Sequence, residues 1–476
     1  MPTSLAEELE EQSRWTPRPG EADHAPFKGL IKNEFLPPAE LAALQDQAAL
    51  NMLRFATAVV PYYRDVIRRE NIDIGRLSGL ADWPRLPILT KEIQHREFRR
   101  LHAERLPRGE EDGGYAESSG TSGAPTRIAR TLRSRLLFGL FKQRELRWFR
   151  FDPAGTMAWV RFSGDIPKMP DGRPIRPGET FRDAAWPVVG FYFVTGPFIA
   201  FDKTNPPDEC AAWLEGHRPD YLTAAAAMQE HLALAYQSRQ PPDYLRGNVA
   251  ISETLTPGMK ARVEAIFGAP LFQNYGQNEV GLVAAKCPEG GRYHTHAEHA
   301  FVEIVDDDGM PVAAGETGRM LITDLNNYAM PLIRYDTGDL AVAVTGPCAC
   351  GRTIGPMFAD PVRRRARVAP LPRGSDVLID GLRGVMETLP KDMSLPLRGY
   401  RIHQDKDENY RLDVVLKDAD AVPFEDHVRA AWANLEGSAG HALSFRTFDT
   451  IPILRNGKFM HVTSEFIAPD DDAIGT

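Results

Sequence analysis

Residues 245–279 read LRGNVAISETLTPGMKARVEAIFGAPLFQNYGQNE and carry the clearest fold signal in the chain. Residues 245–251 are a strand candidate, and a helix over 257–267 and a strand over 270–274 follow. The same alternation extends over residues 155–345, with further strands predicted at 157–162 and 198–201 and further helices at 208–214 and 228–237. Strands that alternate with helices are typical of α/β layers around a largely parallel sheet.

The regions on either side depart from this alternation. Upstream, residues 38–70 have the apolar spacing of a helix, which Pro61 interrupts, and Thr90 is placed to cap a short helix. Downstream, residues 301–305 and 318–323 read as antiparallel strands joined by an Asp-rich turn. The chain therefore adds a helical lead-in and an antiparallel piece to the α/β layers.

A composition shift marks a second domain near the C-terminus. Residues 363–367 form a basic cluster, and residues 369–375 are rich in Pro and Gly, as a linker is. The last hundred residues contain an alternating strand at 411–416 and a helical pattern at 425–435. We therefore expect an N-terminal domain over 1–362 (with 1–110 mainly helical), a hinge over 363–376 and a C-terminal α+β domain over 377–476.

Composition and charge exclude several classes of protein. With 476 residues, 43% of them hydrophobic and 25% charged, the chain is globular and long enough for two to four domains. The net charge of −9 gives no global basic field, so we expect neither nucleic acid nor a membrane surface as a partner. The uncharged stretch 184–201 is broken by Pro and Gly and reads as strands or a pocket wall. Four cysteines exclude a disulfide scaffold, and we expect a cytoplasmic protein.

A loop rich in Ser, Thr and Gly is the strongest local signal for chemistry. It runs from Tyr115 to Thr126, and its backbone N–H and side-chain hydroxyl groups could wrap a polyphosphate. It is not a Walker loop, because no Gly-Lys-Ser/Thr follows at the required spacing. By itself such a loop could equally be a plain connection.

Three later segments favour the phosphate interpretation. In 272–279, which follows a predicted strand, Tyr275 could stack on a base and Glu279 could hold Mg²⁺. The segment 334–340 places Asp339 after a glycine turn, where its carboxylate could accept both hydroxyls of a ribose. The fourth segment, 451–458, ends in the glycine-borne Lys458.

These segments, in this order, resemble the motifs of the adenylate-forming superfamily, and within it those of the phenylacetate–coenzyme A ligase family with its capsular-polysaccharide-biosynthesis relatives. Residues 118–126 resemble the phosphate loop, 252–254 the adenine-contacting loop, 275–279 the Tyr-Gly-x-Thr-Glu motif and 337–339 the ribose-binding motif. Residues 86–92 resemble a segment typical of this branch, and 456–458 resemble the loop that delivers the adenylation lysine. The resemblance covers roughly residues 40–465.

The resemblance implies a fold and a set of site residues. The fold is α/β: a large N-terminal domain of layered α/β sheets with a β-rich subdomain, and a small mobile α+β lid that carries Lys458. Lys458 and Glu279 are the catalytic residues it implies, with Glu279 also as the Mg²⁺ ligand. The implied nucleotide- and phosphate-binding residues are Ser118, Ser119, Gly120, Thr121, Ser122, Gly123, Thr126, Ser252, Glu253, Thr254, Asn274, Tyr275, Gly276, Asn278, Asp339 and Arg373.

The chain departs from the family pattern at three places. Thr126 stands where many adenylating enzymes carry Lys, and Asn278 replaces the usual hydroxyl residue before Glu279. In the hinge, Pro372 replaces a glycine, and Ser375 stands where an acidic residue is expected. The hinge departures put the usual domain rotation between two half-reactions in doubt.

Cys287, His294, Cys348 and Cys350 give a separate hypothesis. Three thiolates and an imidazole are a tetrahedral set for structural zinc, and some members of the resembled family carry zinc through a similar arrangement. Three free cysteines and a surface histidine remain the alternative. His296 and His299 compete for the place of the fourth ligand.

The implied activity is the ATP-dependent conversion of an organic acid, aromatic by resemblance, to an acyl-adenylate with release of pyrophosphate, followed by thioester formation with coenzyme A. Transfer to an amine or to a carrier-protein thiol is an alternative. A non-catalytic nucleotide-binding relative and a zinc-stabilised interaction protein are further ones. The chain could act as a monomer or a homodimer.

Four aromatic residues fall between the phosphate loop and the adenine segment. A flat apolar pocket for the acid could form there, although ordinary core packing explains each residue equally well. These residues are Trp186, Phe191, Phe193 and Phe198.

Overall fold

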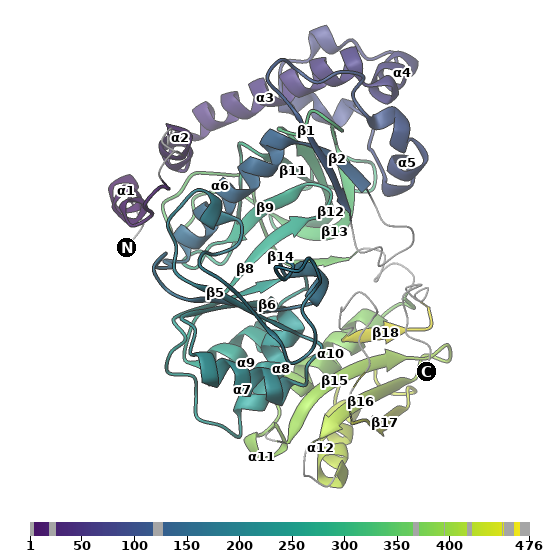
Figure 1. Ribbon diagram of the computed structural model, residues 1–476. Helices are drawn as coiled ribbons and strands as arrows, with labels where there is room; N and C mark the ends of the chain where they lie inside the picture. The colour runs from purple at the N-terminus through teal and green to yellow at the C-terminus, as the bar shows by residue number, and fades with distance from the viewer. Residues whose placement is uncertain are drawn as a thin grey trace.

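The structure is a computed structural model of the chain. The residues it describes are 4–18, 25–117, 127–364, 371–394, 396–416, 421–449, 451 and 461–466. Within them a large domain precedes a small one, which lies below it in Figure 1. No helix in these ranges combines the length and the apolar character that a membrane span requires.

Helices dominate the first hundred residues, as the sequence predicts. Pro61 ends one long helix and starts the next, because a proline fits the first turn of a helix but not its interior. Thr90 caps the following helix by accepting a hydrogen bond from the Ile93 N–H at 3.3 Å. The α-helices are α1 (Leu5–Ser13), α2 (Ala25–Asn33), α3 (Pro38–Val59), α4 (Pro61–Arg69) and α5 (Lys91–Arg96). Short 3-10 turns are η1 (Ile74–Arg76), η2 (Leu80–Arg85) and η3 (Phe98–Leu101).

A hairpin leads from this lead-in into the α/β layers. Its strands, β1 (Asp112–Glu117) and β2 (Arg127–Thr131), pair antiparallel on either side of the segment 118–126. Helix α6 (Leu132–Trp148) starts directly after β2, where the Thr131 hydroxyl caps it by accepting from the Ser134 N–H at 3.1 Å.

One half of the main sheet is parallel, and four of its strands match the predicted alternation, whereas the strands over 180–183 and 221–225 were not predicted. Its order is β8-β7-β6-β3-β5, with parallel pairing throughout and β4 added antiparallel at the edge. The strands are β3 (Met157–Arg161), β4 (Thr180–Asp183), β5 (Phe198–Asp202), β6 (Tyr221–Ala225), β7 (Gly247–Ile251) and β8 (Leu271–Gln277). The helices that lie against this half in Figure 1 are α7 (Pro207–His217), α8 (Ala226–Tyr236) and α9 (Pro257–Phe267).

The other half of the same sheet is antiparallel, so the prediction of a largely parallel sheet holds for only part of it. The order continues from β8 as β9-β10-β14-β13-β12-β11. Four of these strands were not predicted, because their residues were interpreted as motifs and turns. The strands are β9 (Gly281–Lys286), β10 (Tyr293–Thr295), β11 (Ala300–Val305), β12 (Thr317–Asp324), β13 (Tyr335–Val344) and β14 (Met357–Arg364).

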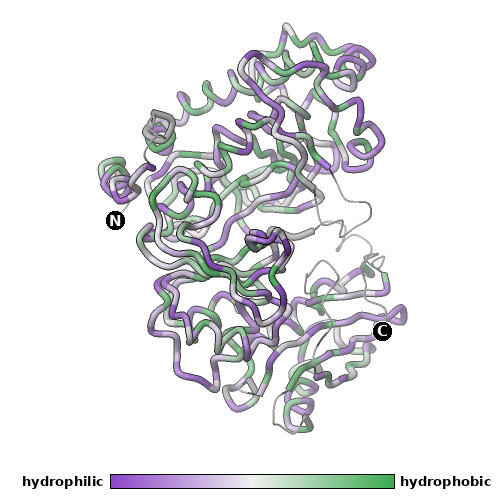
Figure 2. Tube along the Cα trace, in the orientation of Figure 1, coloured by the Kyte–Doolittle hydropathy of each residue, from purple (hydrophilic) through white to green (hydrophobic). Residues whose placement is uncertain are grey.

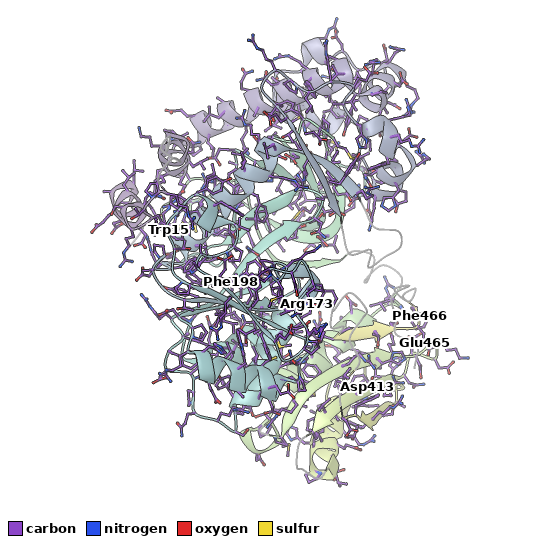
Figure 3. The ribbon with its side chains drawn as sticks, viewed as in Figure 1. Trp15, Arg173, Phe198, Asp413, Glu465 and Phe466 are labelled. Carbon is purple, nitrogen blue, oxygen red and sulfur yellow. The ribbon has the colours of Figure 1, made fainter. Side chains whose placement is uncertain are left out.

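The small domain has its own core beside a four-stranded sheet of order β17-β16-β15-β18. Asp413, labelled in Figure 3, is buried there between the guanidinium groups of Arg401 and Arg411. Its elements are α10 (Ser375–Glu387), α11 (Lys391–Ser394), β15 (Leu397–Gln404), β16 (Tyr410–Leu416), α12 (Ala421–Ala433), β17 (Leu443–Thr447) and β18 (Val462–Ser464). In Figure 2 apolar and polar residues alternate along the outer helices, as expected for helices with one buried face.

Candidate functional site

Two of the sequence motifs lie at the ends of neighbouring parallel strands. Strands β7 and β8 pair in parallel with Ala250 opposite Gln273, so both carboxyl ends reach the same edge of the sheet. Ser252–Thr254 follows β7, and the Asn274–Glu279 segment ends β8. In open α/β sheets ligands bind outside the carboxyl ends of the strands. With residues 337–339 of β13, we call these segments the motif edge.

Asp339 reaches the motif edge through an irregularity in β13. In the pairing with β12, Arg319 faces Leu340 and Leu321 faces Asp336, so β13 accommodates extra residues at this point. Gly338 takes a φ of 74°, a left-handed conformation that favours glycine. The Asp339 N–H donates to the Thr337 hydroxyl at 3.1 Å. A bulge re-aims a side chain, and here it aims a carboxylate that is only 6% exposed.

A hydrogen bond joins the Tyr275 motif to the Asp339 motif. The Tyr275 hydroxyl donates to Asp339 Oδ2 at 2.7 Å, and the Gln277 amide donates to the same oxygen at 2.7 Å. The Tyr275 ring is buried and meets Phe358 of β14 edge to face. Two segments that lie some sixty residues apart in the sequence are therefore in direct contact.

The Ser252–Thr254 segment has a strained start and a defined partner. Ser252 has a φ of 65°, and such conformations at non-glycine residues concentrate at functional sites. The Glu253 carboxylate accepts a hydrogen bond from the Ala227 N–H at 2.9 Å, in the first turn of α8. Glu253 thus serves as a side-chain cap for a helix whose own N-cap residue, Ala225, supplies none.

Arg130 contacts the motif edge, and sequence reasoning missed it. One guanidinium nitrogen donates to the carbonyls of Asn278 at 3.1 Å and Glu279 at 2.8 Å, and the other donates to Asp324 at 3.1 Å. The side chain is 8% exposed, and β2 carries it directly after the segment 118–126. No strand was predicted at residues 127–131, so the sequence analysis had no element on which to place this arginine.

Asn274 and Gly276 lie on the face of β8 opposite to Tyr275, because side chains alternate along a strand. The Asn274 amide donates to Glu145 of α6 at 2.8 Å. A Cβ atom at Gly276 would lie 2.6 Å from the Gly281 carbonyl oxygen, so only glycine fits there. Both residues therefore support the motif edge from the face of β8 that is opposite to Tyr275.

The remaining predicted nucleotide residues are placed only in part. Asn278 is exposed and Glu279 is partly buried at the end of the motif. Arg373 is exposed in the turn before α10. Ser375 begins α10, where its buried hydroxyl accepts from the Gln404 amide at 2.7 Å. Ser118–Thr126, the predicted phosphate loop, and Lys458, the predicted catalytic lysine, lie outside the described residues.

The structure places the four aromatic candidates for the acid pocket in different environments. Trp186, Phe193 and Phe198 are 2%, 1% and 0% exposed and belong to one core cluster, in which Trp15 packs edge to face against Trp186 and Phe193. Figure 3 labels Trp15 and Phe198. Phe191 is 75% exposed. The pocket that these four residues would form together stays a prediction.

Cys287, His294, Cys348 and Cys350 come together at the other end of the antiparallel strands. One ligand atom from each lies within 4.8 Å of the others, and all four residues are buried. The Cys287 and Cys348 sulfur atoms are 3.8 Å apart, and Cys350 Sγ is 3.4 Å from His294 Nε2. The hydrogen bond from Cys287 and the nearby His294 lower the pKa of the Cys350 thiol to about 3. We call these four residues the Cys/His cluster.

The surroundings of the Cys/His cluster orient its members. The Ile354 carbonyl lies 2.7 Å from His294 Nδ1, which leaves Nε2 facing the thiols. Backbone N–H groups of Gly290 and Arg352 donate to the sulfurs of Cys287 and Cys350. A Cβ atom at Gly290 would lie 2.1 Å from Cys348 Sγ, so the turn needs a glycine.

The two histidines that competed for the fourth ligand position lie elsewhere. His296 contacts Glu145, and His299 contacts the Val280 carbonyl. Both imidazole rings stack on the ring of Phe141 in α6.

Buried ion pairs next to the Cys/His cluster connect α1 and the end of α2 to the rest of the large domain. Glu8 of α1 and Glu34 after α2 are fully buried and pair with Arg147 of α6 and with Arg352. Burial raises the pKa of Glu34 to about 7, against the effect of Arg144 and Arg352. Charges this far apart in the sequence give no local pattern, and sequence reasoning did not anticipate them.

Comparison with known proteins defines the class to which this fold belongs. The structure matches a 2-hydroxyisobutyryl-CoA ligase in complex with an acyl-AMP, with a TM-score of 0.69, 17% identity and 91% coverage of both chains. An anthranilate CoA ligase matches with a TM-score of 0.50, 14% identity and coverage of 72% of this chain and 64% of that one. The chain has the fold of the adenylate-forming coenzyme A ligases.

Sequence relatives make the assignment narrower. The phenylacetate–coenzyme A ligase of Thermus thermophilus is 27% identical over 347 residues, which cover 68% of this chain and 71% of that ligase. The phenylacetate–coenzyme A ligase of Aromatoleum evansii is 26% identical over 387 residues, or 78% and 76% of the two chains. No family model matches the sequence. The chain is therefore similar in sequence to phenylacetate–coenzyme A ligases over two thirds or more of its length.

Proposed function

We propose that this protein is an AMP-forming acid–coenzyme A ligase that activates an aromatic carboxylic acid. The observation that carries the proposal is the contact of Tyr275 and Gln277 with Asp339, which unites two motifs of that superfamily at one edge of the sheet. The homologous ligases are named for phenylacetate, and the anthranilate CoA ligase also takes an aryl acid. These names favour an aryl or arylacetic substrate for this chain.

In the first half-reaction an oxygen of the acid's carboxylate forms a bond to the α-phosphorus of ATP, and the bond to pyrophosphate breaks. Asp339 would hold the ribose, since an ionised carboxylate accepts hydrogen bonds from both hydroxyls. Glu279 would hold Mg²⁺, an ion that takes carboxylate and phosphate oxygens and neutralises phosphate charge. The hydrogen bonds from Arg130 to the Asn278 and Glu279 carbonyls would fix the backbone that presents this carboxylate.

The groups on the phosphate side come from the family resemblance. Ser119, Thr121 and Ser122 would donate hydrogen bonds to the departing phosphates. Lys458 would approach both the attacking carboxylate and the α-phosphate as a positive charge, which stabilises the charge that develops between them. The chain supplies positioning and charge in this scheme, without a covalent intermediate of its own.

In the second half-reaction the thiol of coenzyme A loses its proton, its sulfur bonds to the acyl carbon, and AMP departs. The named relatives are coenzyme A ligases, which favours coenzyme A over an amine or a carrier-protein thiol as the acceptor. A non-catalytic nucleotide-binding role would leave Lys458 without a purpose, since binding alone does not require a charge at the attacked phosphate.

The experiment is acid-dependent exchange of labelled pyrophosphate into ATP over aryl, arylacetic and aliphatic acids, with product analysis in the presence of coenzyme A. Lys458→Ala should reduce exchange at least about 100-fold, the size of effect seen when one transition-state charge partner is removed. Lys406→Ala is the matched control, because Lys406 is an exposed lysine of the same domain. Exchange that survives Lys458→Ala would contradict the proposed mechanism.

We also propose that residues 363–376 are a hinge and that residues 377–476 act as a lid. Strand β14 ends at Arg364 and α10 begins at Ser375, so the interval joins the two domains. The hydrophobic core of the small domain lies almost wholly within residues 378–443 and takes in one residue of the large domain, Leu234 of α8, whose contact a lid movement would break. Trypsin cleavage within 363–376 that slows when ATP and acid are added would test this proposal.

A structural zinc ion in the Cys/His cluster is a further proposal. Ideal tetrahedral zinc, with bonds of about 2.3 Å to sulfur and about 2.0 Å to nitrogen, separates two sulfurs by about 3.8 Å and sulfur from nitrogen by about 3.5 Å. The corresponding distances here are 3.8 Å and 3.4 Å. With all four positions taken by protein atoms, the ion would hold loops together rather than bind substrate.

Elemental analysis tests the zinc proposal directly. We expect about one zinc per chain in protein purified without chelator, and loss of that zinc in Cys348→Ser. Cys210→Ala is the control, because Cys210 is a buried cysteine of α7 away from the cluster. Metal-free protein of undiminished stability would contradict the proposal.

A further inference from the structure

We propose that Gln277 is a positioning residue for the ribose of ATP and that it acts by holding the carboxylate of Asp339. Gln277 occupies the variable position of the Tyr-Gly-x-Thr-Glu pattern, to which the pattern itself gives no role. The inference rests on the proposed function, because it concerns the nucleotide of that reaction.

One face of β8 carries the contact with Asp339. Tyr275 and Gln277 are two residues apart, so their side chains lie on the same face of the strand. Asp339 is on β13, and three strands, β9, β10 and β14, separate β13 from β8 in the sheet order. Flat strands so far apart would lie about 19 Å from one another. The hydrogen bonds between them therefore require that the sheet curves and that Gln277 reaches across its concave side.

Hydrogen bonds limit the conformational freedom of Asp339. The backbone around it is fixed, since the Asp339 N–H donates to Thr337, whose hydroxyl donates to the Met320 carbonyl at 2.9 Å. The rotation of the carboxylate depends on the contacts of its own oxygens. Tyr275 and Gln277 both donate to Oδ2 at 2.7 Å, and the Gln277 amide lies 2.9 Å from the Tyr275 hydroxyl. Two donors on one oxygen define the plane of the carboxylate.

Tyr275 and Gln277 are neutral donors, so they orient the Asp339 carboxylate without adding a charge next to it. A carboxylate offers about four acceptor positions, and a ribose brings two hydroxyl donors. Because Asp339 is only 6% exposed, water contributes little to its orientation, and the protein donors must supply it. A side chain ordered before binding costs less entropy when the ligand arrives.

A purely structural role for Gln277 makes a different prediction. If its amide only filled space, its loss would weaken every nucleotide equally or lower stability alone. If it orients Asp339 for the ribose, its loss should matter most for nucleotides that carry both hydroxyls. Deoxynucleotides therefore separate the two roles.

The experiment measures the affinity of the full chain for ATP, 2′-deoxyATP and 3′-deoxyATP by calorimetry with Mg²⁺ and without acid. We expect Gln277→Leu to weaken ATP binding about tenfold, the range for loss of a hydrogen bond to a charged group, and deoxynucleotide binding less than about threefold. Gln277→Asn keeps the amide on a shorter stem and should lie between wild type and Gln277→Leu. Gln47→Leu, on the exposed side of α3, is the matched control.

Equal losses for all three nucleotides, or wild-type affinity in Gln277→Leu, would overturn the assignment of Gln277. A wild-type chain that binds none of the nucleotides would overturn the proposed function together with it. Thermal melting of each variant accompanies the measurement. If Gln277→Leu does not fold, Gln277→Asn must show the same ribose-dependent loss for the assignment to stand.

Discussion

The motif edge and the Cys/His cluster lie at opposite ends of the same antiparallel strands, and they use buried polar groups differently. Strand β9 begins at Gly281 beside the motif edge and ends at Lys286 beside Cys287, a length of about 20 Å. In the cluster, four ligand atoms within 4.8 Å face one another and form a closed set. At the motif edge, Tyr275 and Gln277 both donate to one oxygen of the Asp339 carboxylate.

This difference teaches how to separate a structural site from a ligand site. Closed sets of donors stabilise a fold, whereas sites that act on a ligand keep a position open for it. Changes in the cluster should therefore appear in stability, and changes at Asp339 should appear in nucleotide affinity.

Arg130→Met should have the largest effect and would show where the comparison breaks down. Arg130 contacts the motif edge, and its guanidinium group donates hydrogen bonds to Asp324 and to two backbone carbonyls. Its loss leaves the buried Asp324 carboxylate without this partner. We expect a loss of about 3–5 kcal/mol in the free energy of unfolding and a higher Mg²⁺ requirement for pyrophosphate exchange. Urea unfolding and Mg²⁺ titration measure these. The double variant Arg130→Met with Asp324→Asn should recover part of the stability, and unchanged stability in the single variant would refute the role.

Cys350→Ser should come next and should affect stability rather than chemistry. Loss of one thiolate from a closed zinc set should cost roughly 3 kcal/mol and release the metal. The motif edge lies about 20 Å away, so pyrophosphate exchange at low temperature should stay within about threefold of wild type. Thermal melting and exchange assays on the same samples check both halves. A collapse of exchange with unchanged melting would reverse the roles assigned to the two regions.

Asp339→Asn should produce the opposite signature. The substitution keeps the shape of the side chain but removes the charge that would accept the ribose hydroxyls, so we expect the KM for ATP to rise about 50-fold. The melting temperature should stay within about 3 °C of wild type. Asp243→Asn, at a carboxylate whose side chain is 76% exposed, is the control for charge alone. An unchanged KM would remove Asp339 from the nucleotide site.

The smallest expected effect concerns the interface between the two domains, where His231 lies. Burial, with a smaller contribution from the Lys203 charge, lowers the pKa of His231 to about 4, and this residue of α8 lies against Gly399 of β15. A lowered pKa in the folded state means that neutral His231 contributes its full stability above pH 6.5 and loses it as the pH falls toward 4. Glu230, whose pKa burial raises to about 7, acts in the opposite direction.

The pH effect can be isolated by difference. The difference in free energy of unfolding between wild type and His231→Gln should change by about 2 kcal/mol between pH 7 and pH 5, with wild type losing more. Urea unfolding at each pH measures it, with Glu230 present in both proteins. A gap that does not vary with pH would show that His231 does not titrate in this range.

Sequence reasoning reached the parts of the molecule that depend on local pattern. Helix α9 and strands β3, β5, β7 and β8 follow the predicted pattern, and Thr90 and Pro61 act as expected at helix starts. The members of the Cys/His cluster were predicted from residue type and spacing, and they do come together. These features depend on residues close in sequence or on a distinctive ligand set.

The parts that depend on tertiary closure were not predictable. Gln277 reaches Asp339 only because the sheet curves over three intervening strands, and Arg130 meets Glu279 only through the placement of β2. Trp186 and Phe198 show the same limit, since an aromatic residue in a core and one in a pocket look alike in sequence. The motif identifies a site, whereas the residues that position it emerge from the fold.

The most direct test of the central claim is acid-dependent exchange of labelled pyrophosphate into ATP by wild type and Asp339→Asn, with coenzyme A added afterwards. We predict exchange with an aryl or arylacetic acid, a strongly raised ATP requirement in the variant, and an acyl-CoA product. Exchange that is absent with every acid, in a wild-type chain that binds ATP, would contradict the assignment of this protein as an acid–coenzyme A ligase.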